Sequence, residues 1–66
     1  MRYFDYAPIA RAAHIPPDKL QQLCALVREE FPRDEMMYEL HVLRACVAIR
    51  DGCVPLEDVL RTPARA

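Results

Sequence analysis

Six prolines divide this chain of 66 residues into four segments and determine where its helices can begin and end. Proline has no backbone N–H, so it is tolerated in the first turn of a helix but ends a helix that reaches it. Pro16 and Pro17 separate the first two segments, Pro32 separates the second from the third, and Gly52 with Pro55 marks the last join. Apolar residues within the segments follow helical spacing, and no segment shows the alternation of polar and apolar residues that is typical of a strand. The sequence therefore predicts an all-α domain of three to four helices.

The second segment gives the clearest helix. Pro17 or Asp18 opens it, and Asp18 with Gln21 has the spacing of a capping box. Apolar residues recur on one side at helical spacing: Leu20, Leu23, Cys24, Val27 and Phe31. One face of this helix is thus expected to be buried and the other to face water.

The third segment, "DEMMYELHVLRACVAIRDG", predicts the longest helix, from residue 34 to about residue 51. Asp34 and Glu35 give it an acidic first turn, and Gly52 suits the left-handed position that follows a helix. Because the connection around Pro32 is short, the second and third helices are expected to pack as an antiparallel hairpin.

The first and fourth segments predict short helices. Asp5 is expected to cap a helix that runs to about His14, whose side chain would bond the last carbonyls. Pro55 suits the first position of the fourth helix. Residues 1–4 are expected to be a flexible arm or to lie across a neighbouring surface, and residues 62–66 to form a tail.

Size and charge narrow the class of protein. One domain over residues 1–66 is expected, with 53% hydrophobic residues and nine basic against ten acidic side chains. This balance disfavours nucleic acid and anionic membranes as partners. The three cysteines and the absence of a signal-like apolar run predict a soluble, cytoplasmic protein with reduced thiols.

Apolar residues occupy two faces of the third helix when it is projected at 100° per residue. The first face holds Met36, Met37, Leu40, Leu43 and Val47. The second, on roughly the opposite side, holds Tyr38, Val42, Ala45, Cys46 and Ile49. Glu39 and Arg50 are expected in a solvated seam, and Arg44 at an edge. Both faces must be covered, either by the other helices or by a second copy of the chain.

Side chains able to carry chemistry do not form a recognisable site. No CxxC or HxxxH pair is present, so the spacing of a zinc site is missing. Cys24 and Cys46 fall on apolar stripes and are expected to pack as small core residues, and Cys53 to make the apolar contact that accompanies a glycine cap. His41 is expected along a seam. No catalytic residue, metal ligand or cofactor is therefore predicted.

Residues 45–61 resemble a helix-turn-helix in outline, with Ala48 and Gly52 at the typical separation. Glu57 and Asp58 open the would-be recognition helix and would repel phosphates. DNA binding is therefore the alternative function rather than the favoured one.

The favoured function is a non-enzymatic protein-interaction module or regulatory subunit. It is expected to form a homodimer through the helix at 34–51, or to bind another protein there. The predicted interface consists of Met36, Met37, Tyr38, Val42, Cys46 and Ile49.

Overall fold

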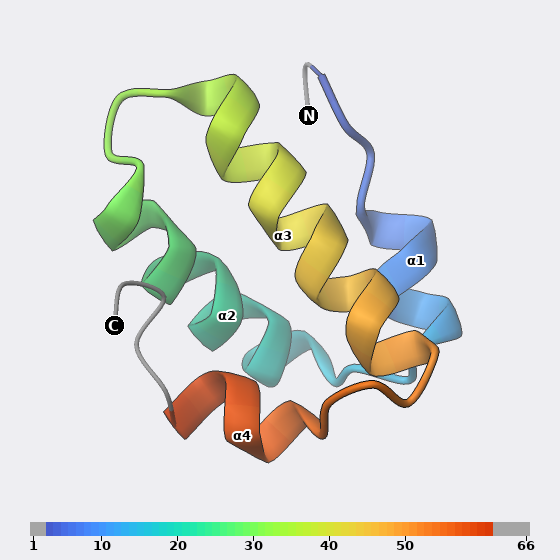
Figure 1. Ribbon diagram of the computed structural model, residues 1–66. Helices are drawn as coiled ribbons and strands as arrows, with labels where there is room; N and C mark the ends of the chain where they lie inside the picture. Colours follow the sequence, from blue (N-terminus) through green and yellow to red (C-terminus); the bar gives the residue numbers. More distant parts are fainter. Residues whose placement is uncertain (1–2, 62–66) are drawn as a thin grey trace.

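The computed structural model describes residues 3–61, which form four helices (Figure 1). They are α1 (Ala7–Ala12), α2 (Pro17–Glu30), α3 (Glu35–Arg50) and α4 (Leu56–Arg61). Helices α2 and α3 run antiparallel, α1 packs against α3, and α4 packs against α2 (Figure 1). The described residues contain no strand, and the prediction of a small all-α domain built on a helical hairpin is confirmed.

Backbone hydrogen bonds close α1 in a Schellman motif. The N–H of His14 donates to the carbonyl of Arg11 at 3.0 Å, and the N–H of Ile15 donates to the carbonyl of Ala10 at 3.1 Å. His14 adopts φ 58°, the left-handed conformation that usually selects glycine here. The prediction that the His14 side chain caps this helix was wrong, because the backbone satisfies these carbonyls and the side chain is exposed.

Both ends of α3 are capped. The Asp34 carboxylate accepts a hydrogen bond from the N–H of Met37 at 3.1 Å. At the other end Gly52 has φ 77°, and the N–H of Cys53 donates to the carbonyl of Ala48 at 2.9 Å. The prediction that Gly52 takes the left-handed position after this helix is confirmed.

The start of α2 differs from the prediction. Of the two predicted first residues, Pro17 and Asp18, the helix begins at Pro17. Its N-cap is Pro16, and no side chain caps the helix. Asp18 therefore lies inside the first turn instead of at the N-cap. The Asp18–Gln21 capping box does not form for this reason.

The core lies around α3. Among the residues whose burial is described, seven hydrophobic ones from three helices and one turn are buried: Ala10, Ile15, Leu23, Val27, Tyr38, Val42 and Cys46. Part-buried residues of α4, including Leu56, Val59 and Leu60, pack against this core. The chain therefore covers the Tyr38–Val42–Cys46 side of α3 by itself.

Glu39 is buried on the same helix, with only 1% of its surface exposed. Its Oε1 accepts hydrogen bonds from the backbone N–H groups of Tyr3 at 2.8 Å and Phe4 at 2.9 Å. The prediction of a solvated seam for Glu39 was wrong, because the start of the chain runs beside α3 and covers this position (Figure 1). Of the predicted arm and tail, residues 1–2 and 62–66 lie outside the described residues.

Candidate interaction surface

Four apolar residues of α3 lie away from the core and form what we call the outer stripe: Met36, Leu40, Leu43 and Val47. On a projection at 100° per residue they fall within about 60° of arc. None of them belongs to the buried core or to the part-buried residues that pack against it. Met36 is 47% exposed, and the other three are half-buried. The outer stripe is thus an apolar surface that the chain only partly covers.

The outer stripe has the spacing of a helix-pairing seam. Its members are separated by four, three and four residues, which is the alternation of the a and d positions in a heptad repeat. Arg44 borders the stripe and is exposed, so the predicted edge position of this arginine is confirmed. Side chains with this spacing can interdigitate with those of a second helix.

Three residues of the predicted interface lie inside the single chain. Tyr38 is 8% exposed, and Val42 and Cys46 are fully buried. Ile49 is part-buried against the same core, while Met36 is exposed and Met37 is half-buried. The surface of the folded chain therefore offers a partner the two methionines, but not Tyr38, Val42 or Cys46.

Arg28 links α2 to the start of α3. Its Nη2 lies 2.9 Å from Glu35 Oε1, and its guanidinium carbon lies 3.6 Å from the centre of the Tyr38 ring. The hydrogen bond to Glu35 is the main cause that raises the pKa of Arg28. These contacts place the charged group over the aromatic face, where cation–π attraction adds to the ion pair. They hold the α2–α3 hairpin together beside the connecting loop.

Hydroxyl and thiol groups meet inside the domain. The Cys24 thiol donates a weak hydrogen bond to Tyr6 Oη at 3.7 Å. Burial is the main cause that raises the pKa of both Tyr6 and Tyr38, and burial raises the pKa of the Cys46 thiol to about 11. Tyr6, Tyr38 and Cys46 are therefore protonated near neutral pH and lack nucleophilic character.

Cys53 differs from the other two cysteines because it is exposed, while Cys24 is half-buried and Cys46 is buried. The expected core packing is confirmed for Cys24 and Cys46. The apolar contact expected for Cys53 was wrong: its backbone completes the cap of α3, but its side chain faces solvent.

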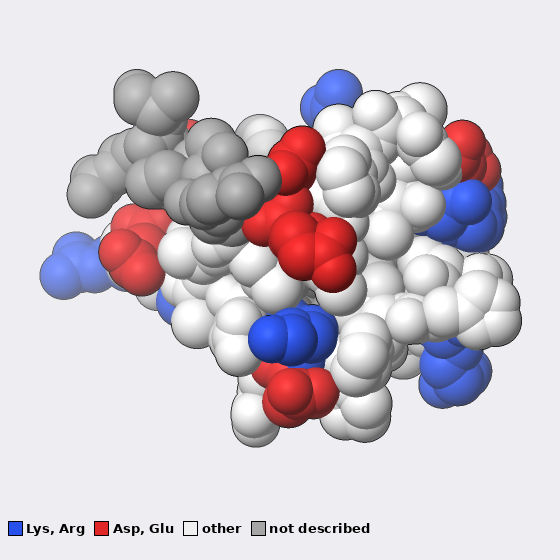
Figure 2. Space-filling view, turned by 90° about the horizontal axis from the view of Figure 1, so that it is seen from below, with Lys and Arg blue, Asp and Glu red and all other residues white. Residues whose placement is uncertain are grey.

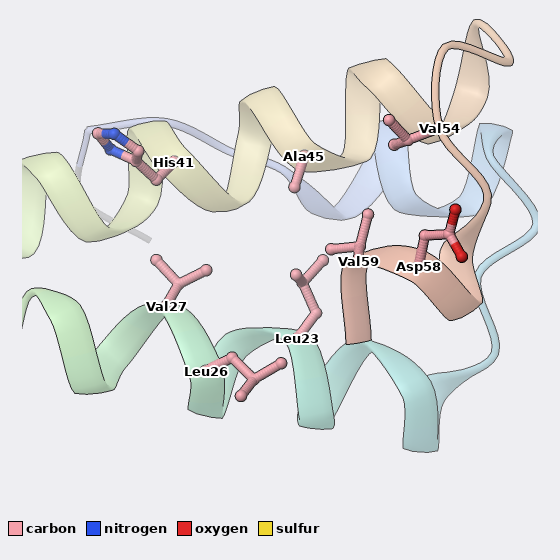
Figure 3. Close-up of a pocket in the computed structure, with 8 residues that line it drawn as sticks. All are labelled: Leu23, Leu26, Val27, His41, Ala45, Val54, Asp58 and Val59. Carbon is pink, nitrogen blue, oxygen red and sulfur yellow. The ribbon is translucent and has the colours of Figure 1, made fainter. Parts of the chain in front are cut away.

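A second apolar surface is a hollow of about 380 Å³ between α2 and α3, with α4 at one end (Figure 3). Leu23, Leu26 and Val27 line it from α2, and Ala45 lines it from α3. His41 lies at the opposite end of the hollow from Asp58 (Figure 3). The hollow is partly open, and its walls are almost wholly apolar.

His41 contacts its own helix and Phe31, the residue that caps the end of α2. Its Nδ1 lies 2.8 Å from the carbonyl oxygen of Met37, so Nδ1 carries a proton and donates it. Its ring centre lies 4.5 Å from that of Phe31. The contact with Phe31 orients the ring.

The described residues offer little for other kinds of site. They contain no group of three histidine, cysteine or acidic side chains that could hold a metal ion. No helix among them is long and apolar enough to cross a membrane. On the face shown in Figure 2, Lys and Arg side chains lie in separate places, several of them beside acidic ones. The visible part of that face therefore carries no continuous basic surface of the kind that binds nucleic acid.

No protein-family model, curated protein or solved structure matches this chain.

Proposed function

We propose that this chain is a non-enzymatic protein-interaction module, or small regulatory subunit, that associates with a second copy through the outer stripe of α3. The observation that carries the proposal is the position of Leu40, Leu43 and Val47, which have heptad spacing but lie outside the core. Met36 extends the same surface and is 47% exposed.

Chain length supports this proposal. A chain of 66 residues buries a smaller fraction of its surface than a larger domain does, so its own core supplies little stability in excess of the entropy cost. Covering the outer stripe adds roughly 25 cal/mol for each Å² of apolar surface removed from water. A symmetric dimer is the commonest way in which soluble proteins cover such a surface.

Methionine suits the edge of such an interface. Met36 and Met37 lie at the start of α3 and remain at the surface of the single chain. The unbranched thioether side chain adapts its shape to a partner at little cost. The two methionines that the sequence pointed to therefore keep a place in the proposed interface, while Leu40, Leu43 and Val47 replace its buried members.

The DNA-binding alternative finds less support. Residues 45–61 do form a helix, a turn at Gly52 and a short helix. However, Glu57 and Asp58 lie in the first turn of α4 and are exposed, so they would meet phosphates with negative charge. If this alternative holds, immobilised duplex DNA should retain the protein, and the binding should weaken steeply as the salt concentration rises.

Co-expression of tagged and untagged copies tests the proposal. The tagged copy is expected to retain the untagged copy, and Leu43→Glu in both copies should abolish retention because the stripe then carries like charges. Leu26→Glu is the matched control, since Leu26 is also half-buried but lines the hollow instead. Circular dichroism verifies that both variants remain helical.

Two results would contradict the proposal. Retention that is lost with Leu26→Glu and kept with Leu43→Glu would place the interface in the hollow. A wild-type tagged copy that retains no untagged copy would remove self-association altogether.

A further inference from the structure

We draw no further inference here: the strongest candidate, the hollow between α2 and α3 with α4 at one end, has almost wholly apolar walls, and nothing in the structure shows what covers it.

Discussion

The carboxylate of Glu39 holds the backbone of Phe4, which lies 35 residues earlier in the chain, through a hydrogen bond of 2.9 Å. The same oxygen accepts a second bond from the N–H of Tyr3. Backbone N–H groups bound to an ionised carboxylate form stronger bonds than neutral pairs do. This arrangement joins the start of the chain to the second turn of α3 and closes one side of the core.

Substitutions of Glu39 should therefore loosen the start of the chain. We expect Glu39→Ala to lower the free energy of unfolding by about 2–3 kcal/mol, and Glu39→Gln by about half as much because its amide oxygen still accepts. Denaturant unfolding measures both, and hydrogen exchange should show lost protection at the amides of Tyr3 and Phe4. Glu29→Gln on the exposed side of α2 is the control. Equal stability of all four proteins would contradict the role of this carboxylate.

His14 after α1 and Gly52 after α3 both adopt the left-handed backbone conformation. We expect substitutions at these two positions to change the stability of the protein in opposite directions. Gly52→Ala should destabilise the protein by about 1 kcal/mol, because a Cβ in this conformation is strained even where space is free. His14→Gly should stabilise it by about 0.5–1 kcal/mol, because glycine adopts the same φ without strain. Thermal unfolding of the two variants measures both effects. A loss of stability with His14→Gly would show that the His14 side chain has a structural role.

Thiol labelling should distinguish the three cysteines. At pH 8 a thiol reagent is expected to modify Cys53 first, since it alone is exposed, and Cys46 only after unfolding. Mass spectrometry of the modified peptides identifies the sites. The rapid phase should disappear in Cys53→Ser. Rapid modification of Cys46 in that variant would indicate that the core opens far more readily than the packing implies.

Alkaline pH should destabilise the fold. Burial raises the pKa of Cys46 from 9.0 to about 11, so the folded state keeps a proton that the unfolded state releases. This contribution to stability is complete below about pH 9 and is lost as pH rises towards 11. Cys46→Val should flatten the decline over that interval. A residual decline above pH 10 is expected from Tyr6 and Tyr38, whose pKa values are also raised. If the stability of Cys46→Val fell with pH in the same way as that of the wild type, Cys46 would not be the cause of the decline between pH 9 and 11.

Most of the fold could be predicted from local sequence rules. Pro17 at the start of α2 and Gly52 after α3 act through neighbouring backbone groups, so residue type and position were sufficient. His14 could not be predicted in its left-handed role. Glycine usually fills that position, and here Ile15 and Ala10, both buried, complete the turn.

The candidate interaction surface could be predicted only in part. The sequence showed that α3 has two apolar faces, but choosing the face that α1 and α2 cover requires their positions in space. Glu39 illustrates the same limit, since its partners are backbone groups 35 and 36 residues away and carry no residue-specific signal. Tyr38, Val42 and Cys46 were assigned to the interface for this reason, although the chain itself buries them.

The mass of the wild-type protein in solution is the most direct test of the central claim that the outer stripe pairs two copies. Sedimentation equilibrium at high micromolar concentration should give about twice the chain mass of 7.6 kDa, and Leu43→Glu should return a folded monomer. A wild-type mass of one chain at every concentration would contradict the claim.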